Sequence, residues 1–197
     1  MSATPVIKGL AEVRLHGRGG QGTVVASLML ARAAMLEGKG VQAFPEFGVE
    51  RRGAPVAAFL RIGHEPIHLR CRVDDPDHLL VMDGALLSTL EIPPGRGGAL
   101  VVNSAEPPEA LALPPGWRVA TLDATRIARA RRLGSGALPV VNSPMAAAFA
   151  RISGLVGLEA ILRAVRESAP VAADANVEAA REAWELAGAV RVREAAA

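Results

Sequence analysis

The chain has little of several residue types on which common functions depend. It has one cysteine, no tyrosine and only 3% aromatic residues among 197, and its formal net charge is +2. So small a net charge leaves no electrostatic footprint for nucleic acid, and so few rings cannot stack the bases of a single strand. We therefore expect no nucleic-acid partner.

Long apolar runs are missing as well. No run approaches the ~18 residues that a membrane-spanning helix needs, and the first residues do not have the pattern of a signal peptide. We expect a cytoplasmic protein with no membrane span.

The single Cys71 restricts the metal chemistry of the chain. One thiol forms no disulfide within the chain, and iron–sulfur clusters and cysteine-type zinc sites need several cysteines. We expect no cofactor held by this chain alone, and no metal site. We also expect Cys71 to be a small buried residue.

Hydrophobic residues are plentiful, at 50% of the chain, and their spacing indicates the fold class. One core can be built from them, so we expect a single domain over residues 1–197. Strands are predicted at 13–16, 41–44, 79–82, 99–103 and 119–122, and helices at 24–35, 124–133, 144–155, 158–165 and from 177 onward. The segments 56–62 and 67–70 predict an antiparallel hairpin. The pattern is that of an α/β three-layer domain with a mostly parallel sheet.

A glycine-rich turn, HGRGGQG at residues 16–22, separates the first predicted strand from the first predicted helix. Glycines at this spacing permit a tight turn and a close approach of backbone to pyrophosphate, while the first amides of the helix face the anion. Arg18 adds a positive charge that suits phosphate in general. The predicted cofactor-binding residues are Gly17, Arg18, Gly19, Gly20, Gln21 and Gly22, and a tight turn without a ligand is the alternative.

Two features argue against a nicotinamide or flavin dinucleotide at this turn. Arg14 and His16 make the first strand polar, whereas the central strand of a dinucleotide-binding fold is usually apolar on both faces. The acidic residue expected about 20 positions later to bind the ribose has no clear candidate, because Glu46 is predicted to lie in a loop after Pro45. A stand-alone nicotinamide-dependent oxidoreductase therefore stays an alternative only.

A second motif, FPEFGVERRGAP, occupies residues 44–55. Glu50, Arg51 and Arg52 lie between two glycines, where they can pair with one another or hold a carboxylate or phosphate. The apolar residues around them, Phe47 among them, indicate that this loop packs against something. An interface or ligand role is therefore predicted for it.

The two motifs together carry a family resemblance that either alone would not. With the later stretches PDHLLVMDGALL and VNSPMAAAFARISGLVGLEAIL, they make nearly the whole chain resemble the gamma subunits of thiamine-dependent 2-oxoacid:acceptor oxidoreductases, and in particular the pyruvate:ferredoxin type. Complexes of this family convert a 2-oxoacid and coenzyme A into an acyl-CoA and CO₂. Some relatives oxidise aryl-substituted substrates such as phenylglyoxylate and reduce NAD through a flavin subunit.

The resemblance implies a Rossmann-like domain with no catalytic residues of its own. It implies partners of the alpha, beta and delta type, which carry thiamine diphosphate, Mg²⁺ and the iron–sulfur clusters, and ferredoxin or a flavin NAD-reducing subunit as electron acceptor. Coenzyme A becomes the candidate ligand of the glycine turn. The residues implied at the junction with the thiamine-binding subunits are Phe47, Gly48, Glu50, Arg51 and Arg52. A ligand-free assembly module is a further alternative.

Three polar residues elsewhere have two interpretations each. Asp83 ends a predicted strand, where ligands of α/β sheets gather, and is also well placed to cap the segment from Ala85. Asn142 and Ser143 precede a predicted helix. We expect all three to be caps first and ligand or partner contacts second.

Overall fold

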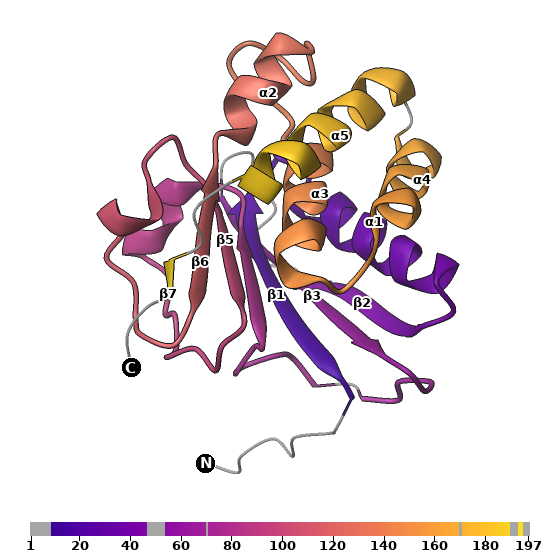
Figure 1. Cartoon of the computed structure of the whole chain (residues 1–197), viewed down its shortest axis with the longest axis vertical. Coiled ribbons are helices and arrows are strands. Elements are labelled where there is room, and N and C mark those ends of the chain that lie inside the picture. Colours follow the sequence, from indigo (N-terminus) through magenta and orange to yellow (C-terminus); the bar gives the residue numbers. More distant parts are fainter. Residues whose placement is uncertain (1–8, 47–53, 70, 170, 190–192, 195–197) are drawn as a thin grey trace.

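The computed structural model describes residues 9–46, 54–69, 71–169, 171–189 and 193–194 (Figure 1). The strands are β1 (Ala11–Arg18), β2 (Gly40–Glu46), β3 (Pro55–Gly63), β4 (His78–Val81), β5 (Ala99–Asn103), β6 (Arg118–Leu122) and β7 (Arg193–Glu194). The α-helices are α1 (Thr23–Leu36), α2 (Ala124–Ala130), α3 (Asn142–Ser153), α4 (Leu158–Ser168) and α5 (Ala173–Ala189), and the 3₁₀ helices are η1 (Gly84–Ser88) and η2 (Pro108–Ala110).

The strands form one mixed sheet in the order β2-β3-β1-β4-β5-β6-β7. Strands β1, β4, β5 and β6 are parallel neighbours. Strand β3 is antiparallel to both β1 and β2, and β7 is antiparallel to β6, so β3 and β7 alone run against the other described strands. The predicted α/β class with a mostly parallel sheet and an antiparallel pair is confirmed.

The antiparallel pair differs from the predicted hairpin. The segment 56–62 does form a strand, β3, but residues 67–69 do not, and the partners of β3 are β1 on one side and β2 on the other. Pro45 does not end β2 either, because it lies within the strand opposite Ala58. Since β2 is the edge of the sheet, a residue without an N–H donor is accommodated there.

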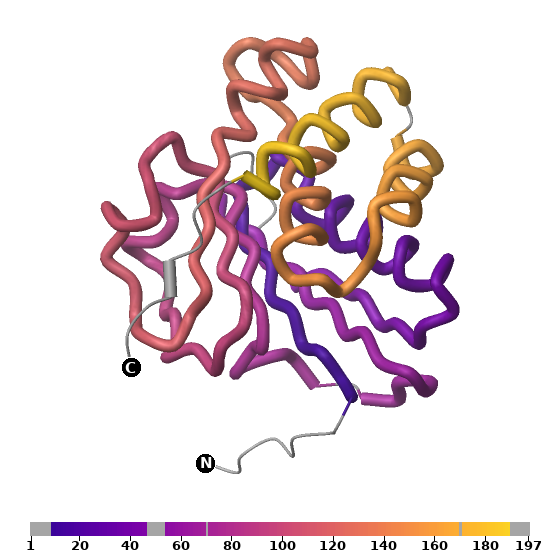
Figure 2. The backbone as a smooth tube through the Cα atoms, viewed as in Figure 1, coloured from indigo at the N-terminus to yellow at the C-terminus, as the bar shows by residue number. Residues whose placement is uncertain are grey.

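Four α-helices, α1, α3, α4 and α5, cover one face of the sheet and form the main core with it (Figure 2). The side chains of Val13, Leu15, Leu60 and Leu80 point from the strands into this core. Helix α3 is buried on nearly every side between the sheet and α5, because its middle consists largely of alanine, which lets neighbouring helices approach closely. Asn142 and Ser143, predicted as caps, are the first two residues of α3, with Val141 before them.

The opposite face is covered by 3₁₀ helices and connecting segments among the described residues. Its apolar part lies over β4, β5 and β6, where Trp117 packs on the strands and donates from Nε1 to the carbonyl of Pro93 at 2.8 Å. Over β1 and β3 the covering is polar, and the fully buried guanidinium of Arg61 pairs with Glu12 at 2.7 Å. Cys71 lies at this polar region and is exposed, so its predicted burial is wrong. Its Sγ is 3.5 Å from Arg61, on the outer side of that cluster.

Candidate anion-binding site at the carboxyl edge of the sheet

The glycine turn joins the end of β1 to the start of α1. Gly20 and Gly22 have φ values of 100° and 85°, in the left-handed region that favours glycine. Gly22 directly precedes α1 and provides no side-chain cap for the helix. Because the first amides of a helix have no acceptors within it, the start of α1 presents backbone donors and the positive end of the helix dipole at this turn.

Close packing explains why side chains are missing from the turn. A Cβ atom on Gly17 would lie 2.2 Å from Thr23 Oγ1, and one on Gly20 would lie 2.5 Å from Leu138 Cδ2. A Cβ atom on Gly22 would lie 2.8 Å from Asn142 Nδ2. The turn is closed further by Gln21, whose Oε1 accepts the backbone N–H of Arg18 at 2.8 Å. The six residues predicted to bind a cofactor thus form one compact turn, while ligand binding by it stays a prediction.

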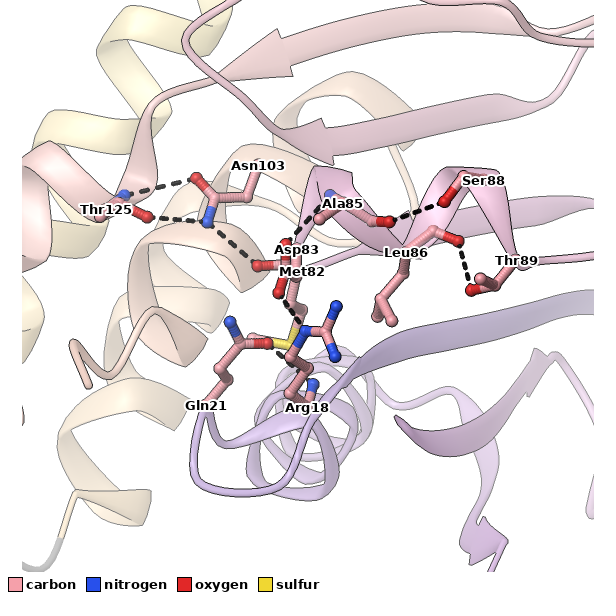
Figure 3. A network of polar contacts seen from close by, with 10 residues as sticks. All are labelled: Arg18, Gln21, Met82, Asp83, Ala85, Leu86, Ser88, Thr89, Asn103 and Thr125. Atoms are coloured by element: carbon pink, nitrogen blue, oxygen red, sulfur yellow. Dashed lines mark hydrogen bonds and ion pairs between the residues drawn. The ribbon is translucent and has the colours of Figure 1, made fainter. Parts of the chain in front are cut away.

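Arg18 is held at the carboxyl edge of the sheet by Asp83, as Figure 3 shows. Arg18 Nε donates to Asp83 Oδ2 at 2.6 Å, and Asp83 Oδ1 accepts the backbone N–H of Ala85 at 3.0 Å. The predicted capping role of Asp83 is therefore confirmed, and the same carboxylate also orients the Arg18 guanidinium. The pair joins the ends of the neighbouring strands β1 and β4.

Asn103, at the end of β5, continues this polar edge and was missed from the sequence. Its Oδ1 accepts the N–H of Ala124 at 3.0 Å. Figure 3 shows that the same oxygen also accepts the N–H of Thr125 and that Nδ2 donates to the carbonyl of Met82 at 3.0 Å. Asn103 therefore ties the end of β4 to the start of α2. Its position after a buried strand, like that of Asp83, was the available sequence signal.

The second motif approaches the glycine turn through its carboxyl end. The N–H of Gly19 donates to the carbonyl of Ala54 at 2.9 Å, and Arg18 pairs with Pro55 at the start of β3. Two segments far apart in the sequence thus meet at one edge of the sheet. The predicted interface residues Phe47, Gly48, Glu50, Arg51 and Arg52 lie outside the described residues, so their role stays a prediction.

Glu46 corrects one premise of the sequence argument. It is the last residue of β2 and not part of a loop, so an acidic residue does stand at a strand end. However, β3 lies between β1 and β2, which places Glu46 two strand spacings, about 10 Å, from β1. Its carboxylate pairs with Arg72 at 2.9 Å. This geometry does not provide the ribose contact of a dinucleotide site.

His16 lies on the polar face of β1 and is not available as a cation. Burial, together with the charges of Arg14 and Arg72, lowers the pKa of His16 to about 4, so the ring is neutral near pH 7. Its Nε2 atom is buried without a hydrogen-bond partner in the described part of the chain. His16 therefore belongs to the buried polar region and brings no positive charge to the glycine turn.

A metal site and a membrane-spanning helix are both absent from the described residues. Across them, no group of three or more His, Cys, Asp or Glu side chains is arranged to hold a metal ion. No helix within those ranges is long and apolar enough to cross a membrane.

Fold and site together define an α/β domain of the Rossmann-like type, with an antiparallel strand inserted beside the first strand and a glycine turn that presents a helix N-terminus. Residues 12–186 match the family model of pyruvate ferredoxin/flavodoxin oxidoreductase. The chain belongs to this family, as a gamma-type subunit.

Known gamma-type subunits are similar in sequence to this chain over most of their length. The chain is 46% identical to the pyruvate synthase subunit PorC of Methanosarcina barkeri over 80% of this chain and 85% of that protein. It is 43% identical to the pyruvate/ketoisovalerate oxidoreductases common subunit gamma of Thermococcus litoralis, over 89% and 96% of the two chains. The crystal structure of the pyruvate oxidoreductase subunit PORC of Thermotoga maritima matches with a TM-score of 0.75 at 36% identity, over 94% and 98% of the two chains.

Proposed function

We propose that this chain is the non-thiamine-binding gamma subunit of a complex that oxidatively decarboxylates a 2-oxoacid to an acyl-CoA. In this proposal the glycine turn helps to bind coenzyme A, and the chain helps to assemble the complex. The observation that carries the coenzyme A part is the turn itself, where the amides at the start of α1 lie beside an arginine oriented by Asp83. Phosphate groups such as those of coenzyme A bind at this combination of donors and charge.

The chemistry proper is assigned to other subunits. Thiamine diphosphate, when bound there, supplies the stabilised carbanion needed for decarboxylation, and iron–sulfur clusters there carry the electrons. Nothing among the described residues fits Mg²⁺ or a cluster. The contribution of this chain is to hold the phosphate end of coenzyme A, which leaves the thiol end to reach the thiamine-bearing subunit.

Two features support the assembly role. Helix α1 exposes the apolar side chains of Leu28 and Met35 by about half, 50% and 53%, and a partner subunit would remove them from water. The Thermococcus litoralis relative is named as a subunit common to two oxidoreductases. A shared gamma chain is expected where substrate choice lies in the other subunits, which here are the alpha, beta and delta types.

Co-purification tests the assembly. A mild affinity tag on this chain in its native cell should bring down larger subunits together with thiamine diphosphate and iron, with ferredoxin or a flavin NAD-reducing subunit as acceptor. A chain that emerges alone and binds NAD saturably would instead establish the stand-alone oxidoreductase.

Arg18→Ala in the assembled complex tests the ligand role. Losing a charged hydrogen-bond donor should raise the KM for coenzyme A about tenfold or more and leave the KM for the 2-oxoacid unchanged. Arg96→Ala is a matched control, because Arg96 also pairs with an aspartate, Asp75, but at an exposed site on a different segment. Equal KM values for coenzyme A in the Arg18 variant and the wild type would remove coenzyme A from this turn and favour a ligand-free assembly module.

A further inference from the structure

Two helices begin at the glycine turn. Helix α1 starts after Gly22 and helix α3 starts at Asn142, and neither has a side-chain cap. Asn142 packs directly on Gly22. A Cβ atom added to Gly22 would lie 2.8 to 3.0 Å from the Nδ2, Cβ and Cγ atoms of Asn142. The positive ends of two helix dipoles therefore meet at one place.

The side-chain amide of Asn142 has a fixed orientation. Its Oδ1 accepts the backbone N–H of Ser143 at 2.8 Å. A backbone N–H can only donate, so the oxygen must face Ser143 and the Nδ2 donor must face Gly22. Ser143 is held in turn by Asn176 of α5, whose Oδ1 accepts from Ser143 Oγ at 2.7 Å.

The donors at this junction are short of acceptors. Asn142 is only 7% exposed as a residue, and within the described residues its Nδ2 has no hydrogen-bond acceptor. This nitrogen is not one of the fully buried unpaired atoms there, so it keeps access to the surface. Thr23, the first residue of α1, is 3% exposed and its Oγ1 also has no partner there. A surface-accessible donor of Asn142 and a buried unpaired hydroxyl of Thr23, both at a helix N-terminus, favour a ligand that offers acceptors.

We propose that Asn142 is a ligand-binding residue of this site, whose Nδ2 donates to a phosphate oxygen of coenzyme A held at the start of α1. This inference rests on the proposed function and adds a second helix to it. A phosphate oxygen accepts more than one hydrogen bond, so it can take one from an amide of α1 and one from Asn142. The site then selects phosphate by donors from two helices, with Arg18 in the same turn.

Asn142→Asp in the assembled complex tests the inference. The carboxylate keeps an acceptor for the N–H of Ser143 and is favoured at a helix N-terminus, so the fold is retained. An oxygen in place of Nδ2 then faces the phosphate, and the Kd for coenzyme A, measured by equilibrium dialysis, should rise about tenfold or more. With pantetheine, a thiol acceptor without phosphate, kcat/KM should equal that of the wild type.

Two further variants separate binding from structure. Asn142→Ser removes Nδ2 without adding charge and should weaken coenzyme A binding about fivefold. Asn176→Asp is the matched control, because the Nδ2 of Asn176 already donates to the carbonyls of Val171 and Ala172. It should lower stability and leave the Kd for coenzyme A within about twofold.

Each outcome bears on one claim. If Arg18→Ala weakens coenzyme A binding but Asn142→Asp and Asn142→Ser do not, Asn142 is not a ligand-binding residue and the proposed function stands. If neither position affects binding, the turn is not the coenzyme A site at all. An equal loss with coenzyme A and with pantetheine would mean that Asn142 acts only on the structure.

Discussion

Single polar atoms without partners gather near the start of the chain. Within the described ranges, the buried side-chain atoms that lack a hydrogen-bond partner are Arg14 Nε, His16 Nε2 and Thr23 Oγ1. Another nitrogen of the Arg14 guanidinium still donates to the carbonyl of Glu91 at 2.8 Å, so only the Nε donor of this side chain lacks a partner. Each unpaired atom costs stability, and all three lie on β1 or at the start of α1.

Thr23→Val is expected to stabilise the protein. Valine has nearly the shape of threonine, so the change removes an unpaired hydroxyl without leaving a cavity, and the free energy of unfolding should rise by about 1 kcal/mol. Urea denaturation of the isolated chain measures this. Thr125→Val is the control, because Thr125 Oγ1 accepts from Asn103 Nδ2 at 3.0 Å, and its loss should destabilise. A decrease in the Thr23 variant would show that its hydroxyl is paired in solution.

At the scale of elements, prediction succeeded where the signal is local. The alternation of Val13 and Leu15 with Arg14 and His16, and the glycines that follow, gave β1, the turn and α1 correctly. The place of β3 was not predictable in this way. Its insertion between β1 and β2 depends on contacts between residues that are far apart in the sequence. The same reason explains Glu46, whose strand continues past Pro45 only because β2 is an edge.

The candidate site shows the same division. The tight turn could be predicted from the spacing of its glycines, and the capping role of Asp83 from its place after a strand. The packing of Asn142 on Gly22 was not, because it brings residues 120 positions apart into contact. Local rules predict Asn142 to be a cap, whereas in the structure it is the first residue of α3.

Two glycines with similar backbone angles should differ in their tolerance of alanine. Gly22 and Gly38 have φ values of 85° and 76°, so alanine costs about 1 to 2 kcal/mol at either position through backbone strain. A Cβ atom on Gly38 meets nothing within 4 Å, whereas one on Gly22 meets Asn142. Gly22→Ala should therefore lose about 1 to 3 kcal/mol more than Gly38→Ala in chemical denaturation. Equal losses would contradict the close packing of Gly22 on Asn142.

At the scale of the whole molecule, stability should depend on pH through His16. Its pKa in the folded chain is about 4, below the ordinary value of 6.5, so the unfolded chain takes up a proton first as the pH falls. Stability should therefore decrease between about pH 6.5 and pH 4, by about 3 kcal/mol at most. Burial also lowers the pKa of His78, so the loss in the wild type has a second contribution of the same sign.

His16→Phe isolates the contribution of His16. The variant retains His78, so the difference in unfolding free energy between the two proteins, followed from pH 7 to pH 4, reports on His16 alone. The slope should be smaller in the variant. Identical slopes would mean that His16 titrates alike in the folded and unfolded chains.

The inserted strand β3 has a consequence for the order in which this protein can form during synthesis. Because β1 and β2 each pair with β3 and not with each other, the described residues up to Glu46 contain no two strands that are neighbours in the finished sheet. Pairing begins only when β3 emerges, and that event also brings Ala54 and Pro55 against Gly19 and Arg18. We therefore expect the glycine turn and the carboxyl end of the second motif to come together in the first step of sheet formation, before α3 is made.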